Sequence, residues 1–121
     1  VVHTQQVTAA IEDVLSLLKD VETGVRGYGI TDDSLFLESY EQARPQVQLR
    51  VAQLRRLLAD NPVQTLRADS LAKLVQAKLD IAERQVIDRT ASRPARVAYL
   101  RLGKIRMDET RRLVNVMLGG E

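Results

Sequence analysis

Residues 7–32 read VTAAIEDVLSLLKDVETGVRGYGITD, and this stretch decides the fold. Its apolar side chains recur in alternating steps of four and three residues, the spacing of a helix face that packs against other helices. These positions are Val7, Ile11, Val14, Leu18, Val21, Val25 and Tyr28. Further apolar residues widen the face beyond a narrow coiled-coil seam, so we expect a bundle helix from about residue 1 to about residue 30.

Three glycines, Gly24, Gly27 and Gly29, fall close together near the end of this predicted helix. A glycine inside a helix costs roughly 1 kcal/mol relative to alanine, so such a cluster needs a packing, turn or functional reason. We expect Gly24 and Gly27 to permit tight helix packing rather than ligand approach. The spacing is not that of a phosphate-binding loop, because the glycines follow a helix and lack a Lys-Ser/Thr ending.

A second amphipathic segment has its apolar positions at Phe36, Tyr40, Ala43, Val47, Val51, Leu54 and Leu58. The steps between them are regular except around Pro45. Because proline removes a helical hydrogen bond and clashes with the preceding turn, we expect the helix to be kinked or broken near Ala43 and Arg44. A complete break would give five helices instead of four.

Capping signals mark the boundaries between segments. The residues at 31–33, Thr-Asp-Asp, are expected to end the first helix and to cap the second. Asn61 is the predicted N-cap of the third helix, with Pro62 at its first position and Gln64 as capping-box partner. The residues at 92–94, Ser-Arg-Pro, separate the third helix from the fourth.

The third helix is expected from about Pro62 to Ala91, and the fourth from about Pro94 to Leu118. The apolar positions of the third helix are Leu66, Leu71, Leu74, Val75, Ile81, Ala82 and Val86. The fourth has one seam at Leu100, Gly103, Met107, Thr110, Val114 and Met117, and another at Leu102, Ile105, Leu113 and Val116.

Four long helices joined by short turns predict an all-α fold, an antiparallel up-down-up-down four-helix bundle in a single domain over residues 1–121. In this topology both chain termini lie at one end of the rod, and the turns at 31–33 and 92–94 lie at the other. The glycine-rich segment is therefore placed at this distal end. The basic residues expected to gather there are Arg26, Arg89, Arg93 and Arg96.

Composition limits the chemistry that is possible. Hydrophobic residues make up 45% of the chain and charged residues 28%, as in ordinary globular domains. Cysteine is absent and His3 is the only histidine, so we predict a non-catalytic domain with no metal site and no cofactor. Basic and acidic residues are interleaved, which argues against a nucleic-acid partner.

Arg26, Tyr28, Arg93 and Arg96 are the candidate ligand-binding residues. An arginine among glycines and beside a tyrosine offers a planar fork for a carboxylate or phosphate ligand at the distal end. The alternative role of Arg26 is structural, because Glu22 lies four residues before it, the spacing of an ordinary helical ion pair. The sequence leaves both roles open.

The sequence resembles the third subclass of the CHASE-type extracytoplasmic sensory domains over nearly its whole length. The most specific part is the run Glu22-Thr23-Gly24-x-Arg26-Gly27-Tyr28, and the similarity continues in Asp60-Asn61-Pro62-x-Gln64, Lys78-Leu79 and Gly103-x-x-x-Met107-Asp108-x-x-Arg111. Of these motif residues, Glu22, Thr23, Gly24, Arg26, Gly27, Asn61 and Pro62 are expected to be structural. The chain departs from the family pattern at Asp32, where a glycine is usual, and at Ser39, where a proline is usual.

The resemblance implies a periplasmic or extracellular sensor domain of an inner-membrane receptor, flanked by transmembrane helices. Its cytoplasmic output would be a histidine kinase or a nucleotide cyclase, driven by helix displacement when an unidentified small molecule or protein binds. The start at Val1 rather than methionine also suggests a domain cut from a longer protein.

Because kinase and cyclase outputs commonly work as dimers, we expect a homodimer paired through the first and last helices. Two alternatives stay open, a chemotaxis-receptor-like ligand-binding bundle and a cytosolic helical protein-interaction module. Apolar segments of about 20 residues on both sides of the domain would favour the sensor over the cytosolic module.

Overall fold

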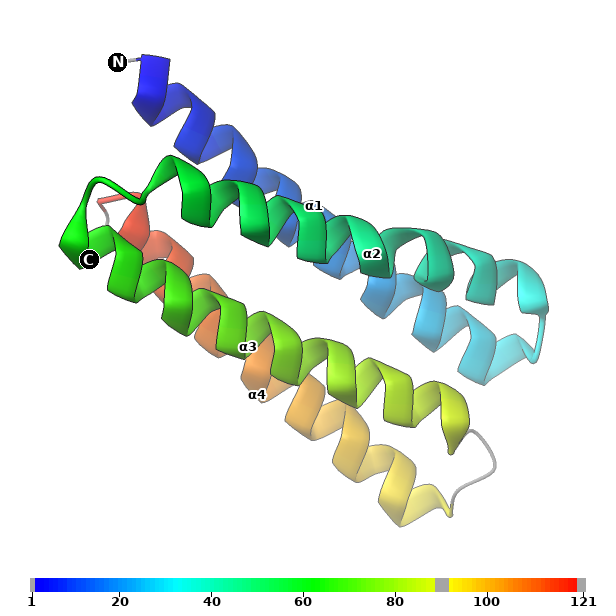
Figure 1. The fold of residues 1–121 in the computed structure, drawn as a ribbon. Coiled ribbons are helices and arrows are strands. Elements are labelled where there is room, and N and C mark those ends of the chain that lie inside the picture. The colour runs from blue at the N-terminus through cyan, green and yellow to red at the C-terminus, as the bar shows by residue number, and fades with distance from the viewer. Residues whose placement is uncertain (1, 89–91, 120–121) are drawn as a thin grey trace.

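The computed structural model describes residues 2–88 and 92–119, with side chains from residue 4 onward. Four helices follow one another, α1 (Val2–Thr31), α2 (Ser34–Leu57), α3 (Pro62–Ile87) and α4 (Arg93–Met117). Both chain ends lie at one end of the bundle, while the α1–α2 turn, the end of α3 and the start of α4 lie at the other (Figure 1). The described residues form no β-strand, so the predicted all-α, antiparallel four-helix bundle is confirmed.

The predicted apolar faces of α1 and α2 form much of the core. Every predicted α1 position is buried except Tyr28, which is half-buried, and among the predicted α2 positions only Phe36 is exposed. The core residues contributed by α3 and α4 are Ala68, Leu71, Val75, Leu79, Ala82, Met107, Val114 and Met117. A continuous apolar core therefore runs between the four helices.

Several predicted core positions of α3 and α4 are instead exposed, namely Leu66, Leu100, Leu102, Ile105 and Val116. Leu66 is exposed because the step of five residues to Leu71 is not a helical repeat, and Ala68 takes the buried position in its place. On α4, one of the two predicted seams faces the other helices and the second has no helix to cover it. The sequence predicted both seams without saying which one packs in the core, and the exposed residues Leu102, Ile105 and Val116 show that it is not the second.

Pro45 lies inside α2, which is continuous from Ser34 to Leu57. Of the two outcomes expected there, a kink or a break, the helix has no break, so the chain forms four helices rather than five. The carbonyl that loses its usual donor belongs to Glu41, and both Glu41 and Pro45 are exposed. Water can therefore replace the missing hydrogen bond.

The predicted N-caps are confirmed. Asp33 Oδ1 accepts a hydrogen bond from the Leu35 amide at 3.0 Å, and Asn61 Oδ1 accepts one from the Gln64 amide at 3.1 Å. The Gln64 side chain does not return to its own cap as predicted, because its Nε2 donates to the carbonyl of Met117 at 3.1 Å. Gln64 thus joins the start of α3 to the end of α4.

The helices pack as two hairpins. α1 lies closest to α2, α4 lies closest to α3, and α3 contacts both α1 and α2 across the interface between the hairpins. The described parts of α1 and α4 make no comparable close approach. α3 is therefore the helix that joins the hairpins, and the side of the bundle between α1 and α4 is open.

The predictions about Arg89 and about a helix end at Ala91 fall outside the described residues, as does the side chain of His3. No helix in the described part of the chain is long and apolar enough to cross a membrane.

Candidate ligand-binding groove

A groove runs along the open side of the bundle between α1 and α4, with α3 as its floor. It consists of two adjoining cavities, an outer cavity of about 410 Å³ at the distal end and an inner cavity of about 480 Å³ nearer the middle. The residues that line both are Arg26, Gln85, Tyr99 and Leu100. The two cavities are therefore parts of one groove.

The outer cavity brings together three of the four predicted ligand-binding residues. Arg26 comes from α1, and Arg93 and Arg96 come from the first turn of α4. Their charges surround an apolar wall formed by Val25, Ile30, Val97 and Leu100. Tyr28, the fourth predicted residue, is not part of this lining.

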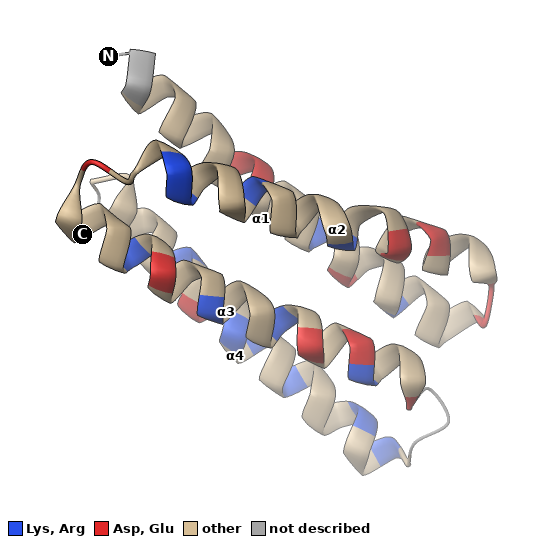
Figure 2. Ribbon diagram, in the orientation of Figure 1, with Lys and Arg blue, Asp and Glu red and all other residues tan. Residues whose placement is uncertain are grey.

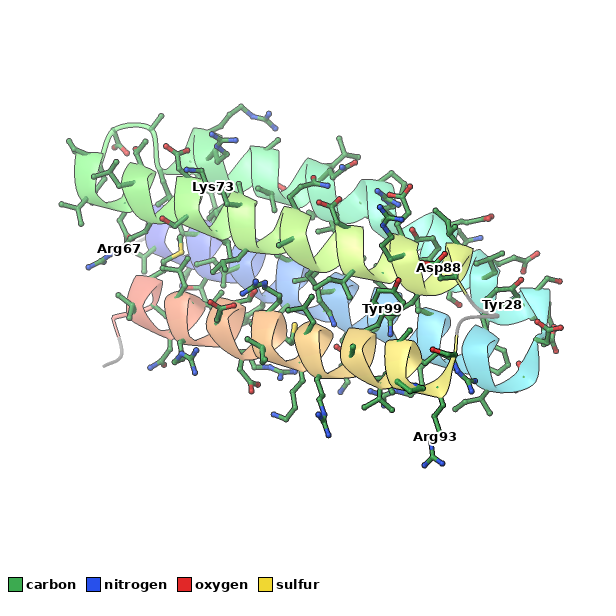
Figure 3. The ribbon with its side chains drawn as sticks, turned by 90° about the horizontal axis from the view of Figure 1, so that it is seen from below. Tyr28, Arg67, Lys73, Asp88, Arg93 and Tyr99 are labelled. Carbon is green, nitrogen blue, oxygen red and sulfur yellow. The ribbon has the colours of Figure 1, made fainter. Side chains whose placement is uncertain are left out.

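The arginines differ in how they are placed. Arg26 Nη2 lies 3.5 Å from Glu22 Oε1, so the ion pair expected from their spacing is present, although the Arg26 side chain is 60% exposed. Arg93 extends outward from the start of α4 (Figure 3). The Arg26 guanidinium is therefore open to solvent beside the outer cavity, whereas the Arg93 side chain points away from the bundle.

Tyr99 and Asp88 form a contact that the sequence did not predict. The Tyr99 hydroxyl donates to Asp88 Oδ2 at 2.6 Å, and Figure 3 shows the two side chains pointing toward each other. This hydrogen bond raises the pKa of Tyr99 above its ordinary value. It ties the start of α4 to the end of α3 across a turn, and no helical spacing could have indicated that pairing.

Lys78 of α3 is the most unusual residue of the inner cavity, because it is only 4% exposed. Its Nζ lies 3.1 Å from Glu22 Oε2 of α1 and donates to the carbonyl of Gly103 in α4 at 3.3 Å. One ammonium group therefore connects three helices. Burying a charge is costly unless it is paired, so Lys78 depends on these partners.

The position of Lys78 explains why residue 103 is a glycine. A Cβ at this position would lie 3.0 Å from Lys78 Nζ, so a side chain would crowd the ammonium group. The sequence predicted that Gly103 allows a neighbouring helix to come close. It makes room specifically for a buried charge, which an apolar pattern cannot indicate.

The inner cavity holds more cations than carboxylates. Glu22 is shared between Arg26 and Lys78, and Asp108 is shared between Lys104 at 2.9 Å and Arg111 at 3.9 Å. The hydrogen bond from Lys104 lowers the pKa of Asp108. The inner cavity therefore has a surplus of positive charge even after these pairs are formed.

Basic residues dominate the part of α4 that borders the groove. Figure 2 shows acidic and basic residues mixed along the first three helices, whereas the charged residues in the first half of α4 are all basic. Asp108 is the first acidic residue of α4. Most of the positive charge of the groove is thus supplied by α4.

Gly24 and Gly27 serve the α1–α2 interface, as predicted, whereas Gly29 lines the outer cavity. A Cβ on Gly24 would lie 2.8 Å from the Phe36 carbonyl oxygen and 3.0 Å from the Tyr40 amide nitrogen. A Cβ on Gly27 would overlap the Phe36 ring, whereas one on Gly29 would meet nothing within 4 Å. The glycines at 24 and 27 let α2 lie directly against α1.

Among the residues with described side chains, no group of three or more His, Asp and Glu is placed to hold a metal ion. The described residues that line the groove include no Ser, Thr, Cys or His. The groove has the character of a binding site, with convergent charges and an apolar wall.

The model of the CHASE3 domain family matches residues 1–121, the whole chain, and the protein belongs to this family. CHASE3 domains are extracytoplasmic sensory domains of receptors and are not themselves catalytic. The resemblance seen in the sequence is confirmed. Neither the curated proteins nor the solved structures yielded a significant match.

Proposed function

We propose that this domain is the periplasmic sensor of a transmembrane histidine kinase and that it signals by moving α4 relative to α1. Membership of the CHASE3 family supports the receptor context. The single observation that carries the mechanism is that α4 packs on α3 but is separated from α1 by the groove. The free ends of α1 and α4 lie at the same end of the bundle, where each would continue into a membrane helix (Figure 1).

The ligand of the outer cavity is an anionic small molecule. Arg26 lies on α1 and Arg96 on α4, so an anion that contacts both draws the two helices together. Basic residues at a helix N-terminus oppose the helix dipole, at a cost of roughly 0.3–1 kcal/mol each. A bound anion relieves this cost for Arg93 and Arg96. Tyr28 has no part in this proposal, because it does not line the cavity.

The movement required is small. A shift of about 1–2 Å between packed helices is within the usual range of receptor transitions. A ligand shifts the equilibrium between two helix arrangements only if it binds one of them more tightly. Here the favoured arrangement is the one in which a single anion contacts both α1 and α4. The groove allows such a contact because Arg26 lies on its α1 side and Arg96 on its α4 side.

The ligand proposal is tested by a thermal-shift screen of anionic metabolites on the wild type. We expect a hit to raise the melting temperature of the wild type and not that of Arg26→Ala or Arg96→Ala. Arg101→Ala is the matched control, because Arg101 is an exposed arginine of α4 outside both cavities. Hits that stabilise Arg26→Ala and Arg96→Ala as much as the wild type would show that the ligand binds elsewhere.

The displacement proposal is tested with spin labels at Gln6 on α1 and Asn115 on α4, two exposed positions near the free ends. The chain contains no cysteine, so a double cysteine variant is labelled without background. A hit from the screen should change the distance between the labels in pulsed electron paramagnetic resonance. An unchanged distance would contradict signalling by helix displacement.

The proposed membrane context is tested by the amino-acid sequence of the full-length protein on both sides of this domain. Apolar segments of about 20 residues on both sides, followed by a kinase, are expected. Without such segments, the cytosolic interaction module becomes the better interpretation. Apolar segments followed by a chemotaxis signalling domain would instead favour the chemotaxis-receptor-like bundle.

The homodimer predicted through the first and last helices is proposed here mainly for α4. The apolar seam of α1 is buried, whereas α4 carries the exposed residues Leu102, Ile105 and Val116 on its uncovered seam. Ile105→Glu should weaken self-association in sedimentation experiments. Leu49→Glu is the matched control on α2, where Leu49 is also exposed. Equal effects of the two substitutions would contradict pairing through α4.

A further inference from the structure

The groove concentrates positive charge beyond what the composition provides. Its two cavities are lined by six basic residues and only three acidic ones, which is a larger surplus than the net charge of +2 of the entire chain. The rest of the molecule is thus slightly acidic. A field of this kind attracts anions to the groove specifically.

Lys78 is the one cation of the groove that is held out of solvent. Its ammonium group has three protons to donate, and the two partners in the structure are a carboxylate of α1 and a carbonyl of α4. The carbonyl contact is long at 3.3 Å, so Glu22 is the main partner. Whatever occupies the inner cavity must keep Lys78 paired with an oxygen.

Glu22 is a replaceable partner. Its side chain is 33% exposed, whereas that of Lys78 is 5% exposed, so Glu22 can turn toward water while Lys78 cannot. Arg26 lies 3.5 Å from the other oxygen of Glu22 and offers it a second partner. When Glu22 moves away from Lys78, its carboxylate therefore stays paired with Arg26. Lys78 also stays paired if another oxyanion takes the place of Glu22.

We propose that the inner cavity binds an oxyanion group, a carboxylate or a phosphate, which displaces Glu22 from Lys78. This proposal rests on the anionic ligand of the proposed function and names the group that receives it. Lys78 donates to the incoming anion, and Gly103 leaves the space beside the ammonium open. Arg111 and Lys104, which share a single carboxylate, supply further positive charge.

The exchange links binding to the arrangement of the helices. In the unliganded arrangement Glu22 ties α1 to α3 through Lys78. When the ligand takes this position, α1 loses that tie and gains contacts to the ligand through Arg26. The same event therefore loosens α1 from α3 and draws it toward α4, which is the movement that the sensor requires.

The competition predicts effects of opposite sign for the two partners of one ion pair. Glu22→Gln removes the competing charge, so it should bind oxyanions more tightly than the wild type. Lys78→Met removes the donor and should bind them more weakly. A purely structural ion pair predicts that both substitutions lower stability and that neither strengthens anion binding.

The test is isothermal titration of the purified domain with inorganic phosphate and with succinate at constant ionic strength. Because a hydrogen bond to a charged group contributes about 1.5 kcal/mol, Glu22→Gln should tighten binding of at least one probe about tenfold. Lys78→Met should weaken it by about the same factor. Comparison of the two probes shows whether the cavity prefers phosphate or carboxylate.

Asp20→Asn is the matched control. It makes the same change of charge two residues away on α1, but Asp20 is exposed and lines neither cavity. Its effect should stay within about twofold, since exposed charges at a distance are screened. Circular dichroism confirms that each variant is folded before titration, and the Glu22→Gln result stands even if Lys78→Met does not fold.

The displacement of Glu22 is overturned if Glu22→Gln binds the probes no more tightly than the wild type does. It is also overturned if Glu22→Gln binds neither phosphate nor succinate. The proposed function fails by a different result, namely metabolite hits that are independent of Arg26 and Arg96. If binding of the hits depends on Arg26 and Arg96 but is unchanged by substitution of Glu22 or Lys78, the ligand occupies only the outer cavity. In that case only the inference about the inner cavity is wrong.

Discussion

The two sides of α1 are built in different ways. Toward α2, the glycines at 24 and 27 bring the helices together until the backbone and the Phe36 ring fill the space. Toward α4, the same turns of α1 present Glu22 and Arg26 to a groove of charged side chains. One side is closed by close packing, and the other is an open groove in which Lys78 of α3 connects Glu22 of α1 with the Gly103 carbonyl of α4.

This difference shows how a sensor can combine a fixed part with a movable one. Close-packed interfaces transmit displacement because they have no room to deform. Ion pairs that share partners can be exchanged for contacts to a ligand at little cost. In the proposed mechanism the α1–α2 hairpin would move as a unit, and a ligand in the groove would set the position of α1 relative to α4.

The largest predicted effect comes from filling the closed side. Gly24→Leu should destabilise the domain by about 3 kcal/mol, because its side chain would run into the backbone of α2. Gly29→Ala is the control and should stabilise the domain by about 0.5–1 kcal/mol, since nothing lies near that position. Urea denaturation followed by circular dichroism measures both. A tolerated Gly24→Leu would contradict a closely packed interface.

Removing the buried charge of the groove should have the next largest effect. Lys78→Ala is expected to cost about 2 kcal/mol, because it removes the group that joins three helices and leaves Glu22 without its main partner. Lys73→Ala on the exposed side of α3 should change stability by less than about 0.5 kcal/mol. If the two lysines are equivalent in urea denaturation, the groove has no structural ion pair.

The turn that closes the α1–α2 hairpin provides a smaller, stabilising change. Asp32 has a φ of 60°, in the left-handed region that glycine adopts without strain. Asp32→Gly should raise stability by about 0.5–1 kcal/mol. Asp33→Ala, one residue later, should lower it by about 1 kcal/mol through loss of the N-cap. A destabilising Asp32→Gly would mean that the side chain contributes more than the backbone conformation costs.

The smallest effect concerns the pH dependence of the contact between α3 and α4. The pKa of Tyr99 is raised by its hydrogen bond to Asp88, so the stability from this bond is fully present below the ordinary tyrosine pKa of about 10. It is lost as the pH rises through the higher pKa of the folded state. The difference in melting temperature between wild type and Tyr99→Phe should therefore be constant near neutral pH and shrink above pH 10. A difference that grows with alkaline pH would exclude this bond.

Most of the fold followed from local patterns that depend on one helix at a time. The steps from Val7 to Val25 fix which face of α1 is buried, and Asn61 with Pro62 fixes where α3 begins. The failures were of two kinds. Leu66 lay outside the helical repeat, and the periodicity of α4 could not tell which of its two seams is covered by other helices. A seam of apolar residues describes a helix and says nothing about the number of its neighbours.

The candidate site could be predicted only in part. Arg26 was singled out because it lies among glycines beside Tyr28, and Arg93 and Arg96 because the topology places the start of α4 near the end of α1. Lys78, Tyr99 and Asp88 were missed, because their partners lie on other helices and each pairing depends on helix rotation. Lys78 was noted only as part of the family motif, and Gly103, which makes room for it, was interpreted as a site of helix approach.

The sequence by itself determined the helices, their caps, their antiparallel order and the family, because these depend on spacing, capping chemistry and short connections along one chain. Only the tertiary structure decided that α4 stands apart from α1 and that Lys78 is buried between Glu22 and Gly103. The physical reason is that periodicity fixes which residues share a face, whereas the rotation and spacing of whole helices depend on all their contacts at once. The groove is a product of that spacing.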